Sequence, residues 1–405
     1  MQKALFATAL VTGTLVSVAL YPAAHPTPAT ATTPPAGTVN NATAPAAGSA
    51  RPHIDVVFAL DTTGSMGGLI AAAKDKIWAI ASSMALAQPA PIIRMGLVAY
   101  RDRGDEYVTR VVDLSEDLDS VYANLMDLQA AGGGDGPESV NQALHDAIHR
   151  ISWRRDPRAY KAVFLVGDAP PHMDYQDEVT YVQTLLEAQQ SDIVVNAIQC
   201  GQDGGTGAHW REIAQRGHGS YFQVDQAGSA VAIASPYDQA LADLSRELDA
   251  TRLYYGTVAQ QAQQRRKTDA TAKLHAAAPV AARARRAAFN ATESGSGNLL
   301  GDGELIDDIA SGRVELDAIE PRNLPAALQT LAEPERRRLV ARQAKRRSDL
   351  EQQIDKLTAQ RASYLQERVA AAGGAEQSLD DRIYRAVREQ AATKGLHYTA
   401  DAPAY

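Results

Sequence analysis

One stretch constrains the fold of this 405-residue chain more than any other: the apolar run at residues 54–60 and the oxygen-rich turn at 61–65 that follows it. A run of this length that is rich in β-branched residues is typical of a buried strand. A helical pattern of apolar side chains then extends over residues 69–84. Strand, polar turn and helix in this order open an α/β unit, in which ligands bind beyond the carboxyl ends of the strands.

The turn offers three side-chain oxygens at alternating positions, on Asp61, Thr63 and Ser65. Alternating side chains can direct their oxygens to one point. Hard oxygen ligands suit Mg²⁺ or Ca²⁺, and Mg²⁺ is favoured where water molecules complete an octahedron. The turn is therefore a candidate metal-binding loop.

Two later loops have a similar setting. The glycine-rich segment 131–138 contains Asp135 and Glu138 and precedes a helical pattern that runs to about residue 151. The apolar run 162–166 predicts a central strand, and Asp168 follows it directly. Taken alone, Asp135 could be a helix N-cap and Asp168 a turn residue.

The Asp-x-Thr-x-Ser sequence after a first strand resembles the metal-ion-dependent adhesion site of von Willebrand factor type A domains. The resemblance covers about residues 53–250 and implies a doubly wound α/β fold with a mostly parallel sheet. It also implies a metal site built from three loops, here with the ligands Asp61, Thr63, Ser65, Asp135 and Asp168. The expected ion is Mg²⁺, with Mn²⁺ or Ca²⁺ as alternatives.

In one respect the chain departs from the family pattern, because its second loop offers Asp135 where the family usually has Thr. Three carboxylates around one divalent ion leave the site net negative, which favours metal binding but disfavours a partner's carboxylate. Glu138 is the alternative ligand from this loop, and capping of its own helix is its simpler interpretation.

The remaining sequence predicts more strands and a helical region. Strands are expected at 92–100, 107–113, 193–199 and 221–224, with 107–113 as a hairpin partner or edge. Helices are expected in 236–288, 334–372 and 379–394, with a Gly/Ser/Asn break at 294–303. We therefore expect an α/β, doubly wound von Willebrand factor type A domain at 53–235 and an α-helical C-terminal region at 236–405.

The helix at 334–372 carries a heptad-like apolar stripe at Leu350, Ile354, Leu357 and Tyr364, which Arg361 interrupts. A coiled-coil-like helix of this kind needs a helical partner. The sequence leaves open whether that partner is the 236–288 segment or another chain.

The N-terminal segment indicates export. Lys3 precedes an uncharged apolar run at 4–21, and small residues follow, which is typical of a signal peptide at 1–24. An uncleaved membrane anchor is the alternative. Residues 25–52 are rich in Ala, Thr and Pro and predict a disordered linker. The high Arg and Ala content indicates a bacterial protein, periplasmic or secreted.

Composition limits the other function classes. The net charge of −8 does not favour binding to nucleic acid, which would call for a basic face, and Cys200, the single cysteine, is expected in the core. Ser65 lies in a sequence close to Gly-x-Ser-x-Gly, so a serine hydrolase with His172 is a rival function. His145 and His149 are spaced like a zinc motif, although a boundary-face pair is the simpler interpretation.

Arg101-Asp102-Arg103 is expected to be a charged turn, and lining of the metal face is the alternative. The sequence as a whole favours a non-enzymatic, metal-dependent protein-binding module, with an unidentified protein partner at the metal face. A helical scaffold protein with a purely structural metal is the second rival.

Overall fold

The computed structural model describes residues 51–134, 136–225, 233–371 and 379–398. The predicted signal peptide, the linker up to residue 50 and Asp135 lie outside the described residues. Within the described part of the chain, no helix combines the length and apolar character that a membrane span requires.

A six-stranded sheet forms the centre of the α/β part. Its strands lie in the order β4-β3-β1-β5-β6-β7, and β4 runs antiparallel to β3 while the other neighbours are parallel. The bounds are β1 His53–Asp61, β3 Ile92–Tyr100, β4 Thr109–Ser115, β5 Tyr160–Gly167, β6 Val194–Cys200 and β7 His218–Val224. The predicted doubly wound, mostly parallel sheet and its antiparallel edge strand are confirmed.

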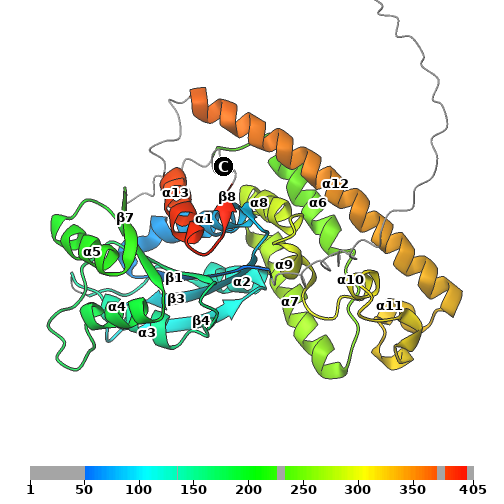
Figure 1. The fold of residues 1–405 in the computed structure, drawn as a ribbon, viewed down its shortest axis with the longest axis horizontal. Coiled ribbons are helices and arrows are strands. Elements are labelled where there is room, and N and C mark those ends of the chain that lie inside the picture. The colour runs from blue at the N-terminus through cyan, green and yellow to red at the C-terminus, as the bar shows by residue number, and fades with distance from the viewer. Residues whose placement is uncertain (1–50, 135, 226–232, 372–378, 399–405) are drawn as a thin grey trace, which may run out of the picture. The chain divides into compact units, whose positions relative to one another are not determined.

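The strand order reverses at β1, because β3 and β4 lie on one side of it and β5, β6 and β7 on the other. Ligands of doubly wound sheets bind beyond the carboxyl ends of the strands at such a reversal. The parallel strands end on the left-hand side of Figure 1, so the loops after β1 and β5 lie together there.

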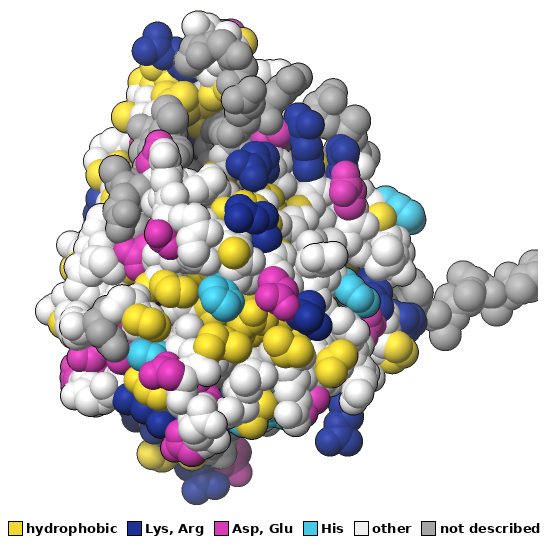
Figure 2. Space-filling model, turned by 90° about the vertical axis from the view of Figure 1, so that its left-hand side faces the viewer, with side chains coloured by type: hydrophobic (Ala, Val, Ile, Leu, Met, Phe, Trp, Pro, Cys, Tyr) yellow, Lys and Arg dark blue, Asp and Glu magenta, His cyan; other side chains and the backbone are white. Residues whose placement is uncertain are grey.

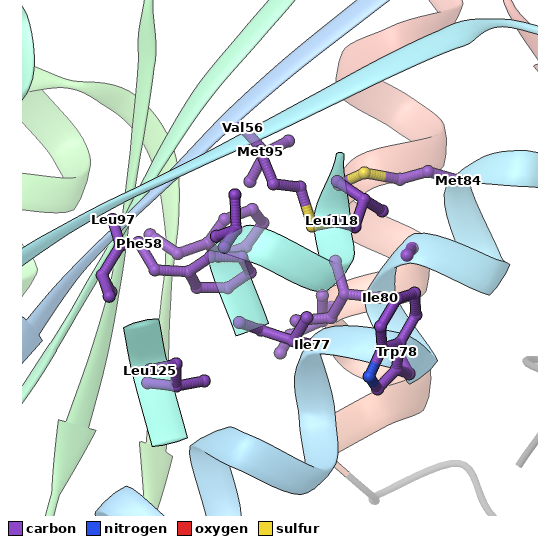
Figure 3. Packing of buried hydrophobic residues seen from close by; sticks show 14 of the residues in the cluster. Val56, Phe58, Ile77, Trp78, Ile80, Met84, Met95, Leu97, Leu118 and Leu125 are labelled. Carbon is purple, nitrogen blue, oxygen red and sulfur yellow. The ribbon is translucent and has the colours of Figure 1, made fainter. Parts of the chain in front are cut away.

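Helices cover both faces of the sheet. Helices α1 and α2 pack on one face, and α3, α4 and α5 pack on the other. Their bounds are α1 Gly67–Ala85, α2 Leu118–Asp127, α3 Val140–His149, α4 Tyr181–Gln190 and α5 Gly204–Arg216. On the first face, Ile77 and Ile80 of α1 and Leu125 of α2 point toward Phe58 and Leu97 of the sheet (Figure 3).

The chain after residue 232 is mainly helical, as predicted. The elements are α6 Asp238–Asp249, α7 Val258–Ala277, α8 Val280–Asn290, α9 Ser296–Leu300, α10 Leu305–Ala310, α11 Ala326–Gln329, α12 Glu333–Ala371 and α13 Leu379–Ala392. Two 3-10 turns, η2 Leu316–Ala318 and η3 Pro321–Asn323, connect α10 to α11. The expected break at 294–303 is wrong in part, since α9 forms there and the Asn298 side chain accepts a hydrogen bond from the backbone N–H of Asp119 (3.0 Å).

The apolar stripe of α12 packs within the same chain. Leu350 and Ile354 are buried against α6 and α8, where they meet Leu241 and Leu248. The helical partner of α12, which the sequence did not identify, is therefore the 236–288 segment. Arg361 does not interrupt this contact, because its buried Nε donates to Asp238 Oδ1 of α6 (2.7 Å).

The helical region shares a core with the sheet. Phe289 of α8 lies against Trp78 of α1, with ring centroids 5.9 Å apart. The last helix, α13, packs on α1 and β7 and covers the same sheet face (Figure 1). Beyond it, β8 His397–Tyr398 pairs with β2 Ala87–Gln88 directly after α1.

A buried ion network also joins the two regions. Arg286 of α8 is fully buried and donates from Nε to Asp119 of α2 (2.6 Å) and from Nη1 to Asp249 of α6 (2.8 Å). Burial raises the pKa of each carboxyl, but the Arg286 guanidinium outweighs it, so the pKa of both Asp119 and Asp249 lies below the ordinary value. Both aspartates are therefore ionised in the folded protein.

Candidate metal centre

The turn after β1 holds its oxygens together through its own hydrogen bonds. Asp61 ends the strand, and its Oδ1 accepts from the backbone N–H (2.8 Å) and the hydroxyl (2.7 Å) of Thr63. The Thr63 hydroxyl lies 3.2 Å from that of Ser65. The Ser65 hydroxyl donates to Oδ1 of Asp168 (3.0 Å), which follows β5. The structure thus places four of the five predicted ligands in one oxygen cluster, formed by Asp61, Thr63, Ser65 and Asp168.

The glycine-rich second loop packs directly on this turn. The backbone N–H of Gly64 donates to the carbonyl oxygen of Gly132 (3.1 Å). Gly132 and Gly133 have φ values of 77° and 78°, a conformation that glycine adopts without steric cost. A Cβ on Gly132 would also fall 2.3 Å from the Asp105 carboxylate, so this close approach requires glycine.

Asp61 is buried with one oxygen unpartnered. Its side chain is inaccessible to solvent, and among the described residues its Oδ2 has no hydrogen-bond partner. Burial raises the pKa of Asp61 to about 7, while the Thr63 hydrogen bonds oppose this; the charge of Asp168 raises the pKa further, and the Asp168 backbone N–H lowers it. A cation next to Oδ2 would therefore stabilise the ionised carboxylate.

Glu138 is a second buried carboxyl beside the oxygen cluster. A Cβ on Gly133 would lie 3.1 Å from Glu138 Oε1 and 3.2 Å from Thr63 Cβ, so the Glu138 side chain reaches the first loop. Its Oε2 is buried without a partner in the described part of the chain, and no capping bond from Glu138 to α3 is found there. Burial, followed by Asp61 and Asp102, raises the pKa of Glu138 to about 9. The expectation that Glu138 caps its helix is therefore wrong.

The loop after β3 adds two more carboxylates beside the second loop: Asp102, which the sequence analysis placed in a charged turn, and Asp105, which it did not single out. Asp102 is buried and accepts hydrogen bonds from Ser139 (3.0 Å) and from the Tyr175 hydroxyl (3.2 Å). Asp105 Oδ2 accepts from the backbone N–H of Gly133 (3.0 Å). The positions of Asp102 and Asp105 in the sequence could have indicated this. They follow β3, which lies beside β1, and the carboxyl ends of these two parallel strands lie on the same side of the sheet.

Arg101 is not part of an exposed charged turn. It is buried, and it donates to the carbonyl oxygens of Thr62 (3.2 Å) and Gln129 (2.9 Å). Arg101 thereby ties the loop after β3 to the first loop and to the segment that leads into the second.

The rival histidine sites have other surroundings. His172 is buried and bonds Asp174 (2.8 Å) and Asp102 (3.3 Å), whereas the described contacts of Ser65 are with Thr63 and Asp168. On α3, the rings of His145 and His149 lie 4.5 Å apart. The His149 ring bonds Glu187 of α4 (2.7 Å), as a boundary-face residue does. Cys200 is buried at the end of β6.

The donor set fits a hard divalent cation. Two carboxylates and two hydroxyls meet at the strand-order reversal, with unpartnered buried oxygens on Asp61 and Glu138 among the described residues. Such oxygen donors suit Mg²⁺, Mn²⁺ or Ca²⁺ rather than a soft metal. In the described part of the chain there is no cluster of three or more His, Cys, Asp or Glu side chains arranged around a metal position.

Together, the sheet and its oxygen cluster define a class of protein, an α/β module with a ligand site at the reversal of a doubly wound sheet. Residues 55–235 match the family model described as von Willebrand factor A domain, and this part of the chain is a domain of that family. Domains of this family generally serve as protein-interaction or adhesion modules rather than as catalysts.

Two curated proteins are similar in sequence to part of the chain. The alpha-protein kinase vwkA of Dictyostelium discoideum is 30% identical over 121 residues, which are 29% of this chain and 19% of the kinase. An ariadne-like RING finger protein of Acanthamoeba polyphaga mimivirus is 25% identical over 119 residues, 29% of this chain and 11% of that protein. The chain thus spans a small part of the length of these relatives.

Solved structures with a similar arrangement include proximal thread matrix protein 1 from the mussel byssus. It is 15% identical, with a TM-score of 0.34 over 43% of this chain and 42% of that one. A second structure of the same protein has a zinc-occupied metal-ion-dependent adhesion site. The SpRpn10 von Willebrand factor A domain is 14% identical, with a TM-score of 0.33 over 44% of this chain and 89% of that chain.

Proposed function

We propose that the domain is a metal-dependent protein-binding module, with the metal face at the carboxyl ends of β1 and β5. The observation that carries the proposal is the oxygen cluster with its buried, unpartnered Asp61 Oδ2. Asp61, Thr63, Ser65 and Asp168 would hold one Mg²⁺ or Mn²⁺. When bound, the ion would neutralise the gathered carboxylates and offer an open position to a partner's oxygen.

For the second loop we propose Glu138 as the ligand, with Asp135 as the alternative. Glu138 is buried, its Oε2 lacks a partner among the described residues, and burial, followed by the charge of Asp61, raises its pKa to about 9. A carboxylate from this loop leaves the loaded site net negative. A neutral oxygen donor on the partner, such as an amide or hydroxyl, is then favoured over a carboxylate.

The surface around the site supports contact with a protein. Met173 and Val179, in the loop that follows Asp168, are exposed at 46% and 36%. Figure 2 shows the face at the carboxyl ends of the strands, where hydrophobic side chains gather near the centre beside histidine and charged side chains. Apolar groups rimmed by polar ones are typical of interaction sites.

Export of the protein is also proposed, from the apolar run at 4–21 alone. A partner would then be met in the periplasm or outside the cell, or at the membrane surface if the segment is not cleaved. Mass spectrometry of the native protein tests this, because a mature N-terminus between about residues 19 and 31 is expected for small-residue cleavage.

The metal is tested by stability. Mg²⁺ at about 100 times its Kd should raise the free energy of unfolding by about 2.7 kcal/mol relative to chelator, as for any ligand that binds only the folded state. Asp61→Ala and Asp168→Ala should lose most of this increment, because each removes a carboxylate of the oxygen cluster. The exposed Asp243→Asn is the matched control and should keep it.

Each variant is compared with its own chelator-treated state, so a general loss of stability does not imitate the result. If Mg²⁺ does not raise the free energy of unfolding of the native domain above its value in chelator, the proposal is overturned. Pull-down of partners with and without chelator then tests the binding function, and capture that persists in chelator would favour the helical scaffold with a structural metal.

The second-loop ligand is tested separately by calorimetric metal titration. Glu138→Gln keeps the side-chain size and removes the charge, and should weaken binding at least about tenfold, or 1.4 kcal/mol. Asp135→Thr should have a smaller effect. If Asp135→Thr weakens metal binding more than Glu138→Gln does, Asp135 is the ligand.

A further inference from the structure

A pocket lies at the amino-terminal ends of β5 and β6, whereas the oxygen cluster lies at the carboxyl ends of the strands. Its volume is about 710 Å³. The end of α3 with the loop after it, the start of β5, and the loop between α4 and β6 form its walls. We call it the basic pocket, and its main lining residues are Ile151, Trp153, Arg155, Lys161, Asp192 and Ile193.

Lys161 places a buried ammonium in this pocket. The residue is 6% exposed, and its Nζ donates to the carbonyl oxygen of Ser191. The one carboxylate in the lining, Asp192, pairs with Lys394 of α13. Burial lowers the pKa of Lys161, and Asp192 offsets this only in part. Among the described residues, no ion pair of the Lys161 ammonium is found, so an anion in the pocket would supply its counter-charge.

One arginine, Arg155, adds to the positive charge of the pocket. Arg155 is exposed and lines the pocket, and no ion pair of its side chain occurs among the described residues. Arg154 also lines the pocket, but its guanidinium pairs with both Asp55 (3.2 Å) and Glu116 (3.3 Å), so Arg155 is the arginine available to a ligand. The pocket is thus basic on a chain whose net charge is −8.

Beside the polar Ser152, Gln190 and Ser191, the lining also contains apolar side chains. Ile151 and Ile193 are buried, at 7% and 3% exposure. The Trp153 indole is held in place, since its Nε1 donates to the carbonyl oxygen of Ala147 (2.9 Å). Apolar walls with a few convergent polar groups are typical of small-molecule sites.

We infer that the basic pocket binds a small organic anion, with its carboxylate or phosphate at Lys161 and Arg155 and an apolar, ring-sized body against Trp153. Guanidinium and ammonium groups both recognise such anions, and the indole supplies a flat apolar surface for a ring. The inference is independent of the metal face, because the two sites lie at opposite ends of the strands.

Phenyl phosphate and benzoate are suitable probes for the full chain, with benzamide as the neutral counterpart of benzoate. Trp78 and Trp210 are fully buried, so a change in tryptophan fluorescence reports mainly on Trp153. Saturable binding of at least one anion is expected, at least about tenfold tighter than that of benzamide. Inorganic phosphate alone should bind more weakly than phenyl phosphate, since it lacks the apolar body.

Arg155→Gln should weaken anion binding several-fold without disturbing the fold, because the side chain is exposed. Lys161→Met should weaken it at least about tenfold. Arg342→Gln, an exposed arginine on α12, is the matched control and should bind as the unaltered chain does. Equal binding of benzoate and benzamide, no saturable binding of either anion, or binding unchanged by Arg155→Gln would each overturn the inference.

Discussion

Replacement of Arg286 by Met is expected to lower the free energy of unfolding by about 3–5 kcal/mol, the cost of breaking a buried ion pair from one side. The substitution leaves Asp119 and Asp249 buried without their shared guanidinium, although each keeps other partners. Methionine fills a similar volume, so the loss is mainly electrostatic. Urea unfolding of both proteins at pH 7 measures it.

The difference should shrink in acid. In the unaltered chain, both carboxyls have folded-state pKa values below the ordinary 3.8, so the stability they contribute is present above that pH and is lost as pH falls further. In the Arg286→Met protein, the buried aspartates take up protons more readily, which removes the penalty. Arg246→Gln on the surface of α6 is the control, and an equal effect of the two substitutions would contradict the role given to the network.

Removal of α13 and β8, by truncation after residue 374, should destabilise the sheet by at least about 4 kcal/mol, because a buried Ile, Val or Leu contributes about 1.5–3 kcal/mol each. Ile383, Val387 and Leu396 are all buried on the sheet face. The truncation also removes Gln390, which bonds the buried Tyr160 hydroxyl (2.6 Å). Thermal unfolding of the two chains compares them.

A point substitution separates packing from chain length. Val387→Ala should cost about 1–2 kcal/mol through the lost methyl groups and the cavity left behind. The exposed neighbour Glu389→Gln should have no measurable effect. If truncation leaves the thermal transition unchanged, α13 does not complete the core.

Local patterns predicted the sheet, and the meeting of the loops after β1 and β5, for a physical reason. Parallel strands are buried on both faces, so each is a nearly continuous apolar run, and the residues just after β1 and β5 must meet at one edge. Asp61 ends β1 and Asp168 follows β5 directly, and hydrogen bonds of Thr63 and Ser65 join the two carboxylates. The sequence therefore contained the geometry of the first and third loops.

The remaining features depend on contacts that leave no local pattern. The stripe at Leu350 and Ile354 shows that α12 has a buried face, but periodicity does not identify the partner helix. Arg286 resembles any charged residue of a surface helix until Asp119, 167 positions away, is placed beside it. The buried position of Glu138 likewise follows from the approach of the glycine-rich loop to the first loop.

The pairing of distant segments has a consequence for how the chain is made. Gln390 bonds Tyr160 across 230 positions and Asn196 across 194, so the cover of the sheet waits for the last part of the described sequence to leave the ribosome. Until then the apolar face beside β7 stays open to solvent or to a chaperone, since exposed strands and apolar surface favour aggregation. We therefore expect the module to become resistant to proteases only after α13 and β8 have been synthesised, and not as soon as the strands of the sheet are available.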